Sequence, residues 1–362
     1  MNHVKTRHIL TVGGMLGMLL AASAPWAQGW VDRTHLNGFL SARYNITNEG
    51  QSWLGSLDSD GIDDDGSFYG TKLGLNISSD LSDRISVMTQ LFSASQEETF
   101  KVHVDWAFGA FRLNDSFQLR AGKIKYPVGI VNEYVEVGVT YPWIQAPVAI
   151  YSEDQAGPQA TRESYNGVSL LWDATTDNWT WGLDFFGGEV DLENMKVKKM
   201  AGVTARADWD DTVLFQASYY QGDMKTDPSM SGMMLAMNNK RHSALVGGIK
   251  VDWNDWIAYA EAAQVKMDFK MMGKSVGDSD SWYATLGHRF GRWLPHVTYQ
   301  DWSRDNGDGH QITTLGLNCN LSSKVVVKAE GSRIETDGKG LFEDRPAGDS
   351  TRMFSVAVDM VF

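Results

Sequence analysis

From residue 33 onward, apolar or aromatic side chains alternate with small or polar ones in stretches of roughly ten residues. A period of two is the repeat of a β-strand with one apolar face and one polar face. Strands of a transmembrane barrel show this pattern because one face meets lipid and the other faces the interior. We count sixteen such stretches, approximately 33–46, 66–80, 84–95, 102–113, 116–125, 164–173, 178–190, 199–209, 212–223, 241–253, 255–268, 281–291, 292–303, 310–320, 323–335 and 350–362.

The connections between these stretches alternate between short and long. The short ones, such as Leu81-Ser82-Asp83 and Asn114-Asp115, consist of residues that tight turns favour. An even number of strands with turns at one end and long loops at the other predicts an all-β fold, a transmembrane antiparallel up-and-down barrel of 16 strands. A soluble barrel with uneven loops would give a similar alternation.

The first residues have the features of an export signal. Lys5 and Arg7 precede an apolar stretch from Ile9 to Leu20, which is too short to span a bilayer. Small residues follow, and cleavage after Ala27 is preferred because Pro25 would hinder cleavage after Ala24. We therefore expect a signal peptide over 1–27 and a single barrel domain over 28–362.

Composition narrows the possible functions. A formal charge of −13 makes the protein a poor nucleic-acid binder. The single cysteine, Cys319, permits neither an internal disulfide nor a thiolate metal site. The acidic stretch 58–66 does not have the spacing of a calcium loop, so we expect a solvated outer loop there, and we predict no metal and no cofactor.

The last stretch has the strongest alternation. Phe354, Val356, Val358, Met360 and Phe362 occupy every second position, and small or polar residues stand between them. Such a strand suits a closed barrel, which leaves no backbone group unpaired in hydrocarbon.

The combination of an export signal, sixteen strands, a long third outer connection and a terminal phenylalanine resembles the Gram-negative outer-membrane porin superfamily. The stretches 117–129, 141–144, 283–290 and 293–299 are similar to segments of general and phosphate-selective porins. The Pro-Glu-Phe-Gly-Gly loop motif of enteric porins is missing. The resemblance implies a location in the bacterial outer membrane, a homotrimer, contact with lipid and lipopolysaccharide, and Phe362 as the signal read by the barrel-assembly machinery.

The third outer connection, 126–163, is far longer than the others, which is typical of a functional segment. In porins this connection is extracellular, folds into the barrel and narrows it. Here it contains Glu133, Glu136, Glu153 and Asp154 among apolar residues, so it could present carboxylates to the lumen. The alternative is an outer lid or trimer latch with solvated acids.

Cations fall on the inward rows of the predicted strands. A wall of cations opposite a loop of carboxylates would set a transverse field across a constriction, orienting dipolar solutes and disfavouring apolar ones. A shift of one residue in phase would instead turn a side chain outward. The wall cations are Arg43, Lys72, Arg84, Arg120 and Arg206. Further inward charges make the lumen mixed in sign: Asp105, Lys250, Glu261, Arg289, Lys328 and Glu330.

These features favour a porin that lets small hydrophilic solutes or ions diffuse passively through a water-filled pore. A barrel that acts as a receptor, adhesin or sheath for a partner protein is the alternative, because the loops would serve that role too. We expect no enzyme, since neither a G-x-S-x-G nor an H-E-x-x-H motif occurs, although outer-membrane hydrolases exist as a class.

Overall fold

The computed structural model describes residues 33–55, 61–95, 100–152, 164–191, 195–226, 232, 236–271, 274–275, 277–348 and 350–362. The predicted signal peptide lies outside these residues and stays a prediction. Among the described residues, no helix combines the length and the apolar character needed to span a membrane.

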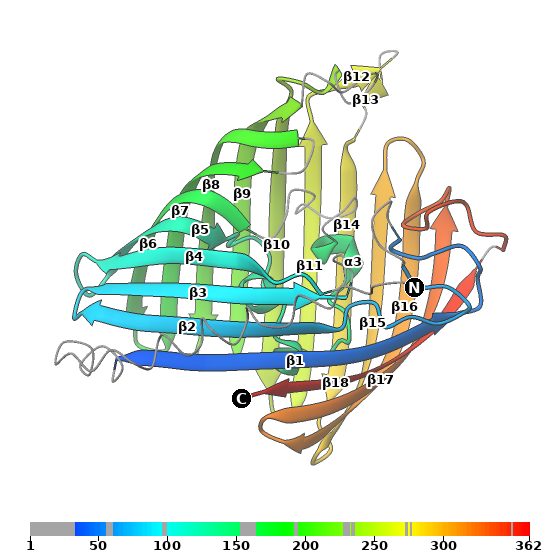
Figure 1. Ribbon diagram of the computed structural model, residues 1–362, viewed down its shortest axis with the longest axis horizontal. Helices are drawn as coiled ribbons and strands as arrows, with labels where there is room; N and C mark the ends of the chain where they lie inside the picture. Colours follow the sequence, from blue (N-terminus) through cyan, green and yellow to red (C-terminus); the bar gives the residue numbers. More distant parts are fainter. Residues whose placement is uncertain are drawn as a thin grey trace, which may run out of the picture.

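Sixteen antiparallel strands form one closed barrel, as the alternation predicted (Figure 1). Each strand pairs with its neighbours along the chain, and β18 closes the ring against β1. The strands are β1 (Thr34–Thr47), β2 (Lys72–Ser82), β3 (Ile85–Ala94), β4 (His103–Arg112), β5 (Phe117–Lys125), β6 (Ser164–Thr176), β7 (Trp179–Asp191), β8 (Met195–Trp209), β9 (Val213–Thr226), β10 (Arg241–Trp253), β11 (Trp256–Met267), β14 (Ser279–His288), β15 (Trp293–Arg304), β16 (Gly309–Ser322), β17 (Val325–Asp337) and β18 (Thr351–Val361). Two short strands, β12 (Lys270–Met271) and β13 (Lys274–Ser275), pair separately.

The predicted strands match the observed ones except at a few ends. The strand predicted to begin at residue 66 begins at Lys72, because the chain turns at Gly66 and Gly70, which both have positive φ. Strand β8 begins four residues earlier than predicted, at Met195. A register shift between Lys198 and Ala201 interrupts its pairing with β9, and this break in the alternation hid the beginning of the strand.

The two faces of the barrel wall have opposite character. On β18, Phe354 is 52% exposed on the outer face, whereas its neighbour Ser355 is 2% exposed and faces inward. The same alternation of exposed apolar and covered polar residues continues on β15 and β16. An apolar outer surface on a ring with no free strand edge is the arrangement that hydrocarbon requires.

The ring closes at a glycine. Gly38 of β1 and Phe362 exchange two backbone hydrogen bonds of 2.9 Å. The Phe362 ring lies over Gly38 so closely that a Cβ atom at residue 38 would overlap it. A glycine at this position therefore lets the phenyl ring of Phe362 cover the last pair of residues of the seam, by which we mean the pairing of β1 with β18.

The interior is partly filled by the connection between β5 and β6. Its described part, 126–152, contains two 3₁₀ helices, η1 (Asn132–Tyr134) and η2 (Gly138–Thr140), and one helical turn, α3 (Val148–Tyr151). α3 contacts β11, β14 and β15, and η2 contacts β18. Figure 1 shows α3 within the ring of strands, so this part of the segment lies inside the barrel.

The seam generates a first prediction. Gly38→Val should displace the Phe362 ring. We expect it to lower the free energy of unfolding by about 1 kcal/mol, which is the usual scale of a cross-strand aromatic contact. Phe362→Ala should have a similar effect, and the double variant should be little worse than either single one, because both changes remove the same contact. Thermal unfolding in detergent micelles measures all three.

Gly109→Val is the matched control, since a Cβ atom at residue 109 meets nothing within 4 Å. Strictly additive effects of Gly38→Val and Phe362→Ala would show that the ring does not stabilise the seam through Gly38.

Candidate functional site

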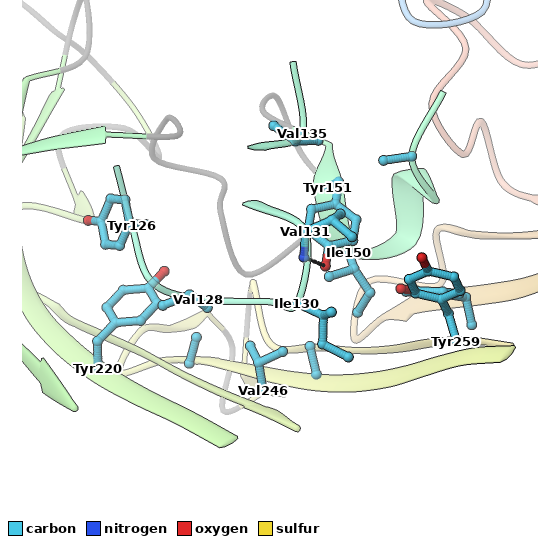
Figure 2. Packing of buried hydrophobic residues seen from close by; sticks show 14 of the residues in the cluster. Tyr126, Val128, Ile130, Val131, Val135, Ile150, Tyr151, Tyr220, Val246 and Tyr259 are labelled. Carbon is cyan, nitrogen blue, oxygen red and sulfur yellow. Dashed lines mark hydrogen bonds between the residues drawn. The ribbon is translucent and has the colours of Figure 1, made fainter. Parts of the chain in front are cut away.

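The apolar side of the segment 126–152 packs against an apolar part of the inner wall. Figure 2 shows Val128 of the segment near Tyr220 of the wall and Ile130 near Val246. All of them are at least nine-tenths buried. Aromatic side chains on inward positions depart from the polar inward row of an empty barrel. This departure was the available signal that a segment of the chain covers this wall.

A buried lysine holds the middle of the segment. The Lys328 ammonium of β17 donates to the carbonyl oxygens of Gly138, Tyr141 and Trp143 at 2.7, 2.9 and 2.7 Å. It also lies 3.0 Å from the Asp359 carboxylate of β18. The Lys328 side chain is 1% exposed, so its charge is compensated by protein groups alone. The alternation of β17 predicts Lys328 on the inward row, but nothing in the local sequence indicates its role as an anchor.

Two wall carboxylates hold backbone N–H groups of the same segment. Glu261 of β11 accepts from the Ile130 N–H at 2.6 Å, and Glu330 of β17 accepts from the Ile144 N–H at 2.8 Å. The Tyr151 hydroxyl donates to Glu261, and burial together with that carboxylate raises the pKa of Tyr151 well above its usual value. The hydroxyl therefore stays protonated and remains a donor. These contacts supply partners that an irregular buried backbone needs.

Of the two predicted loop carboxylates in the described segment, Glu136 is buried. Its Oε2 atom lies 2.5 Å from Nζ of Lys72 on β2, and both side chains are about one-tenth exposed. Lys72 also donates to the Val135 carbonyl oxygen at 3.3 Å. This pair attaches the segment to the wall of β2 and is little exposed to the lumen.

Glu133 lies in a more open setting. Its Oε2 atom is 2.7 Å from Nη2 of Arg206 on β8, and its Oε1 atom is 3.8 Å from Nη1 of Arg120 on β5. The three side chains are 37%, 29% and 23% exposed although they lie within the ring. Arg206 is held by Gln216 at 3.0 Å, and Arg120 lies 5.4 Å above the Phe108 ring centroid. We call Glu133, Arg120 and Arg206 the lumen cluster.

The other predicted site residues have different positions. Arg43 faces inward on β1 and is 6% exposed. The prediction for Arg84 is wrong: it lies in the exposed turn between β2 and β3, because the strand begins one residue later, at Ile85. Glu153 and Asp154 lie outside the described residues. Phe362 lies at the seam described above, and its role as an assembly signal stays a prediction.

A second apolar cluster covers the loop end of the barrel near β15–β17. Trp53, from the loop after β1, stacks edge-on against Phe342, from the loop before β18, with ring centroids 4.8 Å apart. The two loops exchange backbone hydrogen bonds, including Leu54 N–H to the Leu341 carbonyl oxygen at 3.0 Å. The cluster also contains wall residues such as Trp302 and Ile312 and the α3 residues Val148 and Ala149. It lies on a different side of the ring from β5 and β8, which carry the lumen cluster.

Metal-ligating side chains do not gather in groups of three or more anywhere in the described part of the chain.

Lys328 generates a second prediction. Lys328→Met should lower the free energy of unfolding by about 3 to 5 kcal/mol, because the Asp359 carboxylate is left buried without its cation. It should also speed amide hydrogen exchange over 138–143. Lys250→Met, at a part-exposed inward lysine 5.8 Å from the Tyr259 ring, is the control and should change neither quantity much.

Combining Lys328→Met with Asp359→Asn also removes the uncompensated carboxylate, so the free energy of unfolding should partly recover. Fast amide hydrogen exchange over 138–143 should persist, because the ammonium donor is still missing. Unchanged exchange over 138–143 in both variants would contradict the anchoring role of the ammonium.

The structure is similar to those of known outer-membrane proteins, although the sequence is not. Neither a family model nor a curated protein sequence matches the chain. The structure is similar to an anion-selective porin from Comamonas acidovorans, with 12% identity and a TM-score of 0.61 over 91% of this chain and 99% of that one. It is similar to OmpF from Salmonella typhi in complex with daunomycin, with 12% identity and a TM-score of 0.59 over 91% and 97%.

A third similar structure is the trimer form of OmpT, an outer membrane protein of Vibrio cholerae, with 11% identity and a TM-score of 0.58 over 91% of this chain and 99% of that one. The likeness extends over the whole ring of strands. The chain thus has the closed sixteen-stranded fold of porins, and its architecture is that of a bacterial outer-membrane β-barrel.

Proposed function

We propose that the protein is a porin, through which small hydrophilic solutes and ions diffuse passively. One observation carries the proposal: charged side chains of the lumen cluster are reached by solvent although they lie inside a closed ring. A barrel filled by its own chain would bury them. Water inside the ring on the side of β5 and β8 provides a route for polar solutes.

The interior has a filled part and a more open part. Segment 126–152 packs against inward residues of β5–β11, β14 and β15, and the Trp53 cluster lies near β15–β17, so these contacts supply rigidity. Toward the turn ends of β3, β5 and β8, the inward residues Met88, Arg120 and Arg206 remain part-exposed. The pore therefore runs beside the segment, and the segment sets its width.

The electrostatics of the pore follow from the ion pairs. Lys72 is neutralised by Glu136 in a contact that is mostly closed to water, so this pair adds little to a field across the pore. Arg120 and Arg206 share Glu133, and the nearby carboxylate of Asp184 is buried and accepts from Ser169 at 2.5 Å. The pair of Lys72 and Glu136 thus adds little to the transverse field proposed from sequence, and in the lumen cluster cations and carboxylates nearly balance.

Assembly and location complete the proposal. The mature chain forms a homotrimer in the outer membrane, which the trimer form of the similar OmpT structure supports. The barrel-assembly machinery reads the terminal strand through Phe362. The segment 126–152 belongs to an extracellular connection, and no cofactor or energy source takes part.

Liposome swelling tests the function. Purified protein alone, reconstituted into liposomes, should admit small sugars and amino acids and exclude larger oligosaccharides. A sealed barrel that binds a partner protein would support the receptor, adhesin or sheath alternative, and a sealed barrel with hydrolase activity would support an enzyme.

The lumen cluster generates a third prediction. Glu133→Gln removes the carboxylate that Arg120 and Arg206 share, so the reversal potential in a KCl gradient should shift toward anions. Glu136→Gln should shift it less, because the pair with Lys72 is mostly closed to water. Planar bilayer recordings measure both.

Glu335→Gln is the matched control, because Glu335 lies on the outer face of β17 and its removal changes net charge by the same amount. Equal shifts for Glu133→Gln and Glu335→Gln would mean that the lumen cluster does not set selectivity.

A further inference from the structure

The outer face of β17 and β18 carries an unusual pair of charges. Arg333 of β17 and Arg352 of β18 are directly opposite each other in the antiparallel register. Both are exposed. Like charges directly opposite on neighbouring strands destabilise the pairing. Such a pair is stabilised when an anion lies between the two guanidinium groups.

The pair marks the end of the apolar outer surface. Next to it toward the turn end, the register aligns Leu315 of β16, Gly331 of β17 and Phe354 of β18 in one row. Leu315 is 66% exposed and Phe354 is 52% exposed, so both side chains project outward. The arginines therefore lie where the hydrocarbon-facing surface meets the more polar loop end.

Open space lies between these two apolar side chains. A Cβ atom at Gly331 would meet nothing within 4 Å, and the next outward residue of β17 is the small Ala329. On either side of Ala329, Leu317 and Val356 project outward. The small residues of β17 thus leave room, between taller neighbours, that begins directly beside the arginine pair.

The two arginines of the pair differ in their ion-pair partners. Glu335, two residues beyond Arg333 on β17, accepts from Nη2 of Arg333 at 2.7 Å. Arg352 has no ion-pair partner within the described portion of the chain. By contrast, Lys196 and Lys198 at the loop end of β8 are each paired, with Asp191 and Glu189, at 2.6 and 2.9 Å. The two guanidinium groups of the pair thus have one carboxylate in contact with them, although Asp337, further along the outer row of β17, makes the row as a whole neutral.

We propose that Arg333 and Arg352 bind the phosphate group of a lipid in the surrounding leaflet, and that an acyl chain of the same lipid occupies the open space above Gly331 and Ala329. A phosphate monoester carries more than one negative charge at neutral pH and offers three acceptor oxygens, enough for both guanidinium groups despite Glu335. Free phosphate would not fill the apolar space.

Native mass spectrometry of the full-length purified protein tests this with defined lipids. The probe is bisphosphorylated lipid A, compared with the same lipid A after removal of both phosphates. Arg333→Gln with Arg352→Gln should weaken binding of the phosphorylated probe by about tenfold or more, because each basic group near an anionic lipid contributes substantially to binding. Binding of the dephosphorylated probe should not change.

Two further variants separate the parts of the proposal. Gly331→Leu fills the open space without steric conflict, so the barrel should fold normally and bind lipid A several-fold more weakly while both arginines remain. Lys198→Gln with Lys266→Gln removes the same number of cations from the loop end elsewhere and should leave binding unchanged. Inorganic phosphate at millimolar concentration should not displace the lipid.

Three outcomes would overturn the proposal. One is equal loss of binding in the Lys198 and Lys266 control, which would reflect net charge alone. The second is displacement of lipid A by inorganic phosphate, which would indicate a free-anion site. The third is a change in the number of protein copies per complex, with lipid binding intact, in the Arg333 and Arg352 variant, which would identify this face as an interface between copies.

Discussion

A backbone N–H or C=O group that meets hydrocarbon without a partner raises the free energy by several kcal/mol, and a sheet that spans a membrane must therefore have no edge. The pairing of β1 with β18 removes the last edge here. Once the ring is closed, every second side chain must point inward, whatever its chemistry. The charged interior is thus a consequence of closure, since the outer row has to be apolar and the chain's ionisable groups are left for the inner row.

The inner row then determines where the connection between β5 and β6 can lie. An irregular segment inside the ring has backbone groups that no ladder satisfies. Lys328 supplies donors to three of its carbonyl oxygens, and Glu261 and Glu330 each accept one of its N–H groups. Because the wall provides both kinds of partner at fixed register positions, the segment is held in one place and leaves the space beside β5 and β8 to water.

The strands could be predicted from sequence because period two is a local property of about ten residues. Residue types at the site could also be predicted: Glu133 and Glu136 do meet Arg206 and Lys72. The sequence could not predict which of the two carboxylates is reached by water, because this depends on contacts between residues that are 64 to 73 positions apart in sequence. The error at Arg84 arose from a strand end displaced by one residue, and an aromatic inward row was the unused signal for the filled side.

Inside and outside the ring, the same electrostatic rule applies with different partners. Where segment 126–152 fills the interior, the buried cations Lys72 and Lys328 each lie within 3.0 Å of a carboxylate of the same chain, because an uncompensated charge there would be costly. On the outer face, the protein has no such need where a charge reaches the head groups of the leaflet. An arginine that lacks a carboxylate at the edge of the apolar surface, such as Arg352, is then stabilised by the anionic head groups of the membrane itself.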